Sequence, residues 1–90
     1  MAWRLPAGFR FASVELEPGG TRPYAAGEWE DALVLVALGE VELECRDGGR
    51  RRFAKGESLW LSGLPLRALR NPAGEPAVLV RISRDEVMEA

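Results

Sequence analysis

The sequence predicts an all-β domain, either a β-sandwich or a small barrel of about eight short strands. The first observation behind this prediction is a seven-residue apolar run, residues 32–38, which has strand length and ends at Gly39. In the segment after it, residues 40–45, charged and apolar residues alternate as they do in a strand with one buried face. Turn signals also recur roughly every 5–10 residues, with no convincing amphipathic helix between them.

The first expected strand, residues 9–17, carries apolar side chains on both of its faces. Because a strand with one solvent-facing side needs only one apolar face, we expect the second face to be covered in part, for instance by another subunit. The sequence Glu-Pro-Gly-Gly at residues 17–20 then predicts a turn. One face of the strand holds Phe9, Phe11 and Ser13, and the other holds Arg10, Ala12, Val14 and Leu16.

Further strands are expected along the rest of the chain, separated by turns that are rich in glycine and proline. Pro23 places the second strand at a sheet edge, because proline cannot donate to a ladder. Residues 25–31 are small and polar and are assigned to neither a strand nor a helix. The expected strands are 21–24, 32–38, 41–46, 50–54, 58–61, 66–70 and 77–83. The residues expected to be mostly buried are Val34, Val36, Leu38, Val41, Leu43, Leu61, Leu69, Val78 and Val80.

Three consecutive arginines, residues 50–52, follow a predicted hairpin turn at Asp47-Gly48-Gly49. The hairpin sets them across from a strand that holds Glu42 and Glu44. Opposite charges on paired strands contribute roughly 0.2–1 kcal/mol each. We therefore interpret the arginines as part of a solvated, ion-paired edge, the alternative being a site for an anion or a nucleic acid.

Composition sets the broad class of the protein. Residues 1–90 are expected to form a single domain. The formal net charge of −2, from 12 basic and 14 acidic residues, gives no electrostatic reason to expect a nucleic-acid partner. No segment approaches the roughly 18 apolar residues of a membrane helix, and the N-terminus lacks the apolar core of a signal peptide, so we expect a cytoplasmic protein with no membrane partner.

The chain has one cysteine and no histidine. No intrachain disulfide can form, and Cys45 falls in phase with Val41 and Leu43, which predicts a small buried hydrophobe. Without histidine, Ser-His-Asp chemistry and imidazole metal ligation are excluded within this sequence. Arginine outnumbers lysine eleven to one, and Asn71 is the only amide side chain, a bias that is typical of a GC-rich genome and compatible with a thermophilic source.

Two segments together resemble the motifs of the cupin family, small double-stranded β-helix barrels of the jelly-roll type. The first family motif is Gly, five residues, His-x-His, three or four residues, Glu, six residues, Gly. Residues 20–39 match this spacing from Gly20 to Gly39. The second motif is Gly, five residues, Pro-x-Gly, two residues, His, three residues, Asn, and residues 56–71 match its spacing from Gly56 to Asn71. The resemblance implies a cupin-like barrel of antiparallel strands.

This sequence departs from the family pattern at the positions that hold the metal in family members. The two histidines of the first motif correspond to Ala26 and Glu28, its glutamate to Ala32, and the histidine of the second motif to Arg67. Two alanines supply no ligand, and a guanidinium brings a permanent positive charge to the place of the cation. We therefore expect no metal and no other cofactor.

The function that we expect is the binding of a small, anionic molecule in the mouth of a metal-free barrel. In this hypothesis Arg67 and Glu28 face one another, and free guanidinium donors of Arg67 contact the ligand. Tyr24, Trp29 and Trp60 form the walls of the site. The alternative is that Arg67 and Glu28 only neutralise each other and that the two tryptophans fill the core.

Two other classes of function remain open at this point. The chain could be a dimeric interaction or structural protein, and we expect a homodimer because Trp3, Phe9 and Phe11 exceed what a short first strand needs. The cupin resemblance implies pairing through such strands as well. The second open class is a small isomerase-like enzyme, in which Arg67, Glu28 and Tyr24 would transfer protons. The absence of histidine argues against enzymatic activity.

Overall fold

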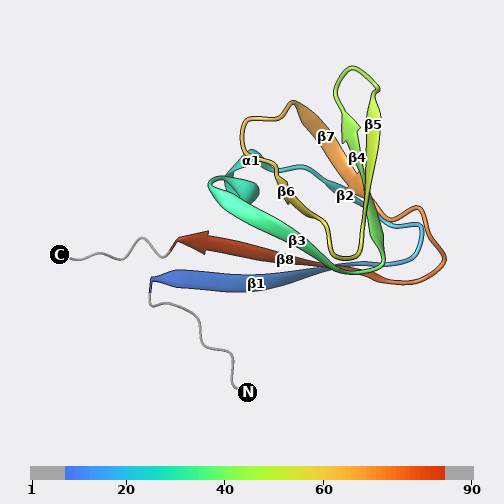
Figure 1. The fold of residues 1–90 in the computed structure, drawn as a ribbon. Coiled ribbons are helices and arrows are strands. Elements are labelled where there is room, and N and C mark those ends of the chain that lie inside the picture. Colours follow the sequence, from blue (N-terminus) through green and yellow to red (C-terminus); the bar gives the residue numbers. More distant parts are fainter. Residues whose placement is uncertain (1–7, 85–90) are drawn as a thin grey trace.

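Two four-stranded antiparallel sheets face each other in this protein (Figure 1). The computed structural model describes residues 8–84. The first sheet has the strand order β1-β8-β3-β6, and the second has the order β2-β7-β4-β5, which is the arrangement of a jelly roll. The elements are β1 (Phe9–Leu16), β2 (Thr21–Pro23), α1 (Ala26–Trp29), β3 (Ala32–Leu38), β4 (Glu40–Cys45), β5 (Arg50–Ala54), β6 (Ser58–Trp60), β7 (Leu66–Arg70) and β8 (Ala77–Arg84).

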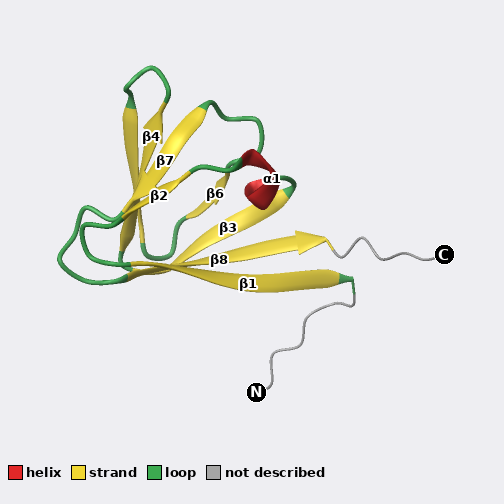
Figure 2. Cartoon of the chain, turned by 180° about the vertical axis from the view of Figure 1, so that it is seen from behind, coloured by secondary structure: helices red, strands yellow, loops and turns green. Residues whose placement is uncertain are grey.

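The two sheets lie close together at one end and spread apart toward the end where α1 lies (Figure 2). The predicted all-β class and antiparallel pairing are thus confirmed, and each expected strand agrees with an observed one to within a residue at either end. Residues 26–29, for which the sequence predicts neither a strand nor a helix, form the single helical turn α1. Among the described residues no helix is long and apolar enough to cross a membrane.

The core fills the space between the sheets. Leu16, Val36 and Leu79 from the first sheet meet Val41 and Leu69 from the second, and all five are buried. Fully burying such an aliphatic side chain contributes roughly 1.5–3 kcal/mol. Of the residues predicted to be buried, Val34, Val36, Val41, Leu43, Leu61 and Leu69 are confirmed.

The predictions that Leu38, Val78 and Val80 are buried are wrong, because at these positions of β3 and β8 the side chains point to the outer face and not to the core. A bulge between Val36 and Leu38 shifts the register of β3 against β8 and leaves Leu38 47% exposed. On β8, Ala77 and Leu79 face the core, so Val78 and Val80 point to the outer side and are only partly buried. The alternation continues past Leu79, which turns Arg81 toward the inside of the sandwich.

Gly39 and Asn71, the last residues of the two cupin-like motifs, hold together the end of the sandwich where the sheets lie close. Gly39 has φ +74°, and a Cβ there would lie 2.8 Å from the Pro76 carbonyl oxygen. The fully buried Asn71 donates from Nδ2 to the carbonyls of Leu16 (3.1 Å) and Glu75 (2.7 Å), and its Oδ1 accepts from the Ala73 amide (3.0 Å). Asn71 therefore ties the turn after β1 to the turn before β8.

The β4–β5 hairpin pairs glutamates with arginines, as the sequence predicted. Glu42 lies opposite Arg52 and Glu44 lies opposite Arg50. Arg52 contacts Glu42 at 3.5 Å and Glu40 at 3.6 Å. Glu42 was expected on the solvent side but is 7% exposed, since the Arg52 and Arg70 side chains flank it. Cys45 is half-buried against the core rather than fully buried.

Candidate functional site

Toward the end where α1 lies, the inner face of the first sheet changes from apolar to polar. Val14 pairs with Leu79 in the last fully apolar row of β1 and β8. The next inward-facing rows pair Ala12 with Arg81 and Arg10 with Ser83. The second sheet has spread away at this point, and α1 lies there instead (Figure 2). All four residues line one pocket together with Gly27 and Glu28 of α1.

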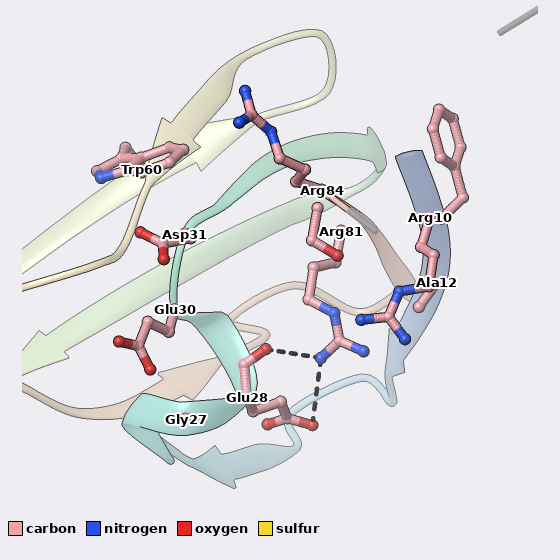
Figure 3. Close-up of a pocket in the computed structure, with 11 residues that line it drawn as sticks. Arg10, Ala12, Gly27, Glu28, Glu30, Asp31, Trp60, Arg81 and Arg84 are labelled. Carbon is pink, nitrogen blue, oxygen red and sulfur yellow. Dashed lines mark hydrogen bonds and ion pairs between the residues drawn. The ribbon is translucent and has the colours of Figure 1, made fainter. Parts of the chain in front are cut away.

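Glu28 on α1 lies at the centre of this polar region. Its carboxylate accepts a hydrogen bond from Arg22 Nη2 on β2 and lies 3.9 Å from Arg81 Nη1 on β8. Arg81 Nη1 also donates to the Glu28 carbonyl oxygen at 2.8 Å, and both of these Arg81 contacts are drawn in Figure 3. A single acidic residue thus links both sheets through two guanidinium groups.

The three linked side chains are largely shielded from water. Exposed fractions are 38% for Arg22 and 25% for both Glu28 and Arg81. The Nε of Arg22 is buried and has no hydrogen-bond partner within the described part of the chain. In such a site two cations flank one anion, so the group carries a surplus of about one positive charge.

A groove runs between α1 and the free ends of β1 and β8, and we call it the arginine groove (Figure 3). Figure 3 shows Arg10, Arg81 and Arg84 toward the β1 and β8 side, while the carboxylates of Glu30 and Asp31 point away from them. Glu28 is thus the acidic side chain of the groove that meets the arginines, while Glu30 and Asp31 point elsewhere. The groove is lined by Arg10, Phe11, Ala12, Gly27, Glu28, Glu30, Asp31, Trp60, Arg81, Ser83 and Arg84.

Solved structures with the same fold include several named cupins. A Cupin 2 conserved barrel domain protein from Salinispora arenicola superposes with a TM-score of 0.66 at 24% identity, over 96% of this chain and 71% of that one. The Cupin_2 domain of an XRE family transcriptional regulator from Enterobacter cloacae gives 0.59 at 26% identity, over 83% and 79%. The chain is a cupin-fold domain. The cupin resemblance predicted from its two motifs is confirmed.

A third similar structure is a sugar phosphate isomerase of the cupin superfamily from Silicibacter pomeroyi. It has a TM-score of 0.59 and 26% identity, over 87% of this chain and 52% of that one. No protein-family model matches the sequence, and neither does any curated protein. The cupin fold is thus established by structure, while the chemistry has to be argued from the residues.

The predicted pairing of Arg67 with Glu28 is wrong. Arg67, on β7, is exposed, and its Nη2 donates to the Arg46 carbonyl oxygen at 3.0 Å. Glu28 is engaged by Arg22 and Arg81 instead. Motif spacing places a residue along the chain, but the helical turn of α1 rotates each residue by about 100°, so spacing alone does not give the direction of the Glu28 side chain.

The three aromatic residues predicted to line the site have different surroundings. Trp29 is fully buried in the core, with the Arg81 guanidinium 5.7 Å from its ring centroid. Tyr24 packs against the core and donates from its hydroxyl to the Leu61 carbonyl at 3.1 Å. Trp60 is 52% exposed and lines the arginine groove. Only Trp60 and Glu28 of the predicted set therefore reach the groove.

Arg10, Arg22 and Arg81 were missed as site residues by sequence reasoning. Arg81 did carry a signal, because it is the only charged residue between positions 77 and 83, in a strand that is otherwise mostly apolar. A lone charge in a mostly buried strand needs a partner, and such a residue is informative for that reason. Nothing in the sequence marks Arg10 or Arg22 in the same way, because each lies in a segment of mixed polar and apolar residues, where an arginine is unremarkable.

The residues at the family's metal positions do not fit a metal ion. Ala26 and Ala32 offer no donor atom, Arg67 bonds a backbone carbonyl, and Glu28 is engaged by two guanidinium groups. Within residues 8–84 no three acidic, cysteine or histidine side chains gather as a ligand set. A cation next to Arg22 and Arg81 would also meet strong like-charge repulsion.

Proposed function

We propose that this cupin domain binds a small anionic molecule, one with a carboxylate or phosphate group, in the arginine groove. The observation that carries the proposal is the Glu28 cluster, in which two guanidinium groups share one carboxylate beside a third, Arg10. Guanidinium groups bind carboxylates and phosphates through two parallel N–H donors. The ligand would supply the missing negative charge.

Arg81 is suited to this role because its position is held before any ligand arrives. Its Nη1 is fixed by the carbonyl and carboxylate oxygens of Glu28, and its guanidinium lies over the Trp29 ring. A side chain that is already ordered loses little conformational entropy when it binds, which saves about 0.5–1.5 kcal/mol for a long side chain. The remaining donors of Arg81 are available to an anion in the groove.

Arg10 is the second contact that we assign to the ligand. It lines the same groove as Arg81, one inward-facing row further along β1. Within residues 8–84 Arg10 forms no ion pair. The hydroxyl of Ser83, which faces Arg10 across the β1–β8 ladder, adds a neutral donor at the same place.

The similar structures do not choose between a binding module and an enzyme. Their names include a transcriptional regulator and a sugar phosphate isomerase, and one fold commonly supports unrelated functions. The proposal therefore rests on the site of this chain alone. It also replaces Arg67, the contact expected from the sequence, with Arg81 and Arg10.

Isothermal titration with inorganic phosphate, acetate, succinate and citrate tests the proposal. At least one of these anions is expected to bind saturably, and Arg81→Gln or Arg10→Gln is expected to weaken it about 10-fold to 100-fold, since a hydrogen bond to a charged group is worth roughly 1.5–3 kcal/mol. Arg50→Gln is the matched control, because Arg50 is an exposed arginine on β5, away from the groove. Equal losses in all three variants, or no saturable binding by any of the four anions, would contradict the proposal.

A further inference from the structure

The arginine groove holds more positive charge than its neighbouring carboxylate neutralises. Arg10 lines the groove together with Arg81, and Arg22 shares the Glu28 carboxylate with Arg81. Three guanidinium groups against one carboxylate leave a surplus of about two positive charges. A singly charged ligand would balance half of this surplus, and a doubly charged ligand would balance all of it.

Three further charged side chains line the groove but contribute less to this balance. Arg84, Glu30 and Asp31 are all exposed, so water and salt screen their charges more strongly than those of the half-buried cluster around Glu28. The two carboxylates also point away from Arg10 and Arg81 (Figure 3). The surplus that a ligand meets is therefore set mainly by Arg10, Arg81 and the Glu28 contacts.

The strand register allows Arg10 and Arg81 to contact one and the same group. Arg10 pairs with Ser83, and Arg81 pairs with Ala12, so the two arginines are diagonal neighbours on the inner face of β1 and β8. Diagonal neighbours lie about 7–8 Å apart, which is within the combined reach of two arginine side chains. Figure 3 shows both guanidinium groups on the same side of the groove. Two like charges placed in this way repel each other until an anion lies against both.

The donors left over at this place suit a group with three acceptor oxygens. Within residues 8–84 Arg10 forms no hydrogen bond or ion pair, and Arg81 uses only its Nη1, on Glu28. The Ser83 hydroxyl lines the same groove and has no partner among these residues either. A phosphate monoester has three terminal oxygens, whereas a carboxylate has two in one plane.

We propose that the anion bound in the arginine groove is a phosphate monoester in its doubly charged form, an inference that rests on the proposed function. Its terminal oxygens accept hydrogen bonds from Arg10, Arg81 and the Ser83 hydroxyl, and its two charges balance the surplus. Glu28 keeps its contacts and holds Arg81 in position. Carboxylates and phosphate diesters carry one charge each and are bound more weakly.

Titration calorimetry with methyl phosphate, dimethyl phosphate and acetate tests this preference. At neutral pH methyl phosphate is expected to bind at least about tenfold more tightly than the other two, because it alone carries close to two charges. If dimethyl phosphate or acetate binds as tightly as methyl phosphate, the phosphate monoester is ruled out while the proposed anion site stands. If none of the three binds saturably, both the inference and the proposed function fail.

The pH dependence separates the charge of the ligand from changes in the protein. Between pH of about 7.5 and about 5, methyl phosphate is expected to lose about fivefold to tenfold in affinity, because its second pKa is near 6 and most of it becomes singly charged. Dimethyl phosphate keeps one charge throughout and is the control. Protonation of Glu28, Glu30 or Asp31, the acidic side chains that line the groove, would alter the binding of both ligands. An equal change for the two ligands overturns the inference.

Replacing Ser83 tests the third donor. Ser83→Ala is expected to weaken methyl phosphate about tenfold and acetate less than about threefold, because acetate has no third oxygen to accept from the hydroxyl. Ser13→Ala is the matched control, since Ser13 is exposed on the opposite face of β1, and it should bind both ligands as the wild type does. A Ser83→Ala variant that keeps the wild-type affinity for methyl phosphate, or weakens both ligands equally, contradicts the three-donor arrangement.

Discussion

At the scale of single residues, Asn71 is the most deeply buried polar side chain in the described part of the chain. It is 1% exposed and makes three hydrogen bonds to backbone groups of the two turns at the close end of the sandwich. Replacing it by alanine leaves two carbonyls and an amide without partners, each at a cost of about 1–3 kcal/mol before relaxation. We expect Asn71→Ala to lower the free energy of unfolding by about 3 kcal/mol.

Thermal or urea denaturation followed by circular dichroism measures this loss. For a domain of this size it corresponds to a fall in Tm of more than about 10 °C. Gly74→Ala is the control in the same loop, because an added Cβ there meets no atom within 4 Å and φ is not positive, so its stability should match the wild type. An Asn71→Ala variant as stable as Gly74→Ala would refute the role assigned to Asn71.

Gly39 gives a second prediction at the residue scale, since it is constrained twice. Its φ of +74° is strained for any side chain, and an added Cβ would lie 2.8 Å from the Pro76 oxygen and 3.0 Å from Ala77 Cα. Gly48 has a similar φ of +95° but open space around it. Gly39→Ala is therefore expected to be destabilised by at least about 1 kcal/mol more than Gly48→Ala in a urea titration; equal losses would show that the close approach is not limiting.

At the scale of elements, Glu28 is what joins α1 to both sheets. Without its negative charge, Arg22 and Arg81 would repel each other, although partial exposure screens the effect. We expect Glu28→Gln to lower the free energy of unfolding by about 1–2 kcal/mol and to speed amide hydrogen exchange in residues 26–29. Glu30→Gln removes a neighbouring carboxylate with no ion pair among residues 8–84, and it should change neither quantity; parallel behaviour of the two variants would contradict the link.

Strands were predictable from the sequence because their signals are local. The apolar run of β3, the alternation of β4 and the glycine and proline turns lie within a few residues of one another, and all eight strands were expected close to where they occur. The four-residue helix α1 was not predicted, since a single turn is too short to show a period. The side chains that meet at Glu28 come from β2 and β8, about sixty residues apart, and no local pattern reports that contact.

Motif spacing predicted correctly which residues lie at the site and at the turns, but it did not predict the direction in which their side chains point. It located Glu28 in the site and identified the frame residues Gly39 and Asn71, whose structural roles are clear. It also suggested Arg67 as the counter-charge, which the structure replaces with Arg22 and Arg81. The inward direction of Arg81 follows from the observed phase of β8, which had been expected to be the opposite.

At the scale of the whole molecule, the two faces of the first sheet differ in chemical character. The inner face continues from the core into the arginine groove, and the outer face carries exposed hydrophobic residues such as Phe11, Leu33 and Trp60. Trp60 and Arg84 line the groove and also lie on the outer face, so the two regions meet there. Trp3, one of the aromatic residues that first suggested a dimer, lies outside the described residues.

The central claim is that the arginines gathered around Glu28 form an anion site. Nuclear magnetic resonance of the arginine Nε–H groups tests it most directly, by titrating the protein with whichever anion of the four binds most tightly. The Arg81 and Arg10 signals are expected to shift saturably and with one shared dissociation constant, while the Arg50 signal stays in place. Shifts that are equally small for Arg81, Arg10 and Arg50, or that never saturate, would contradict the claim.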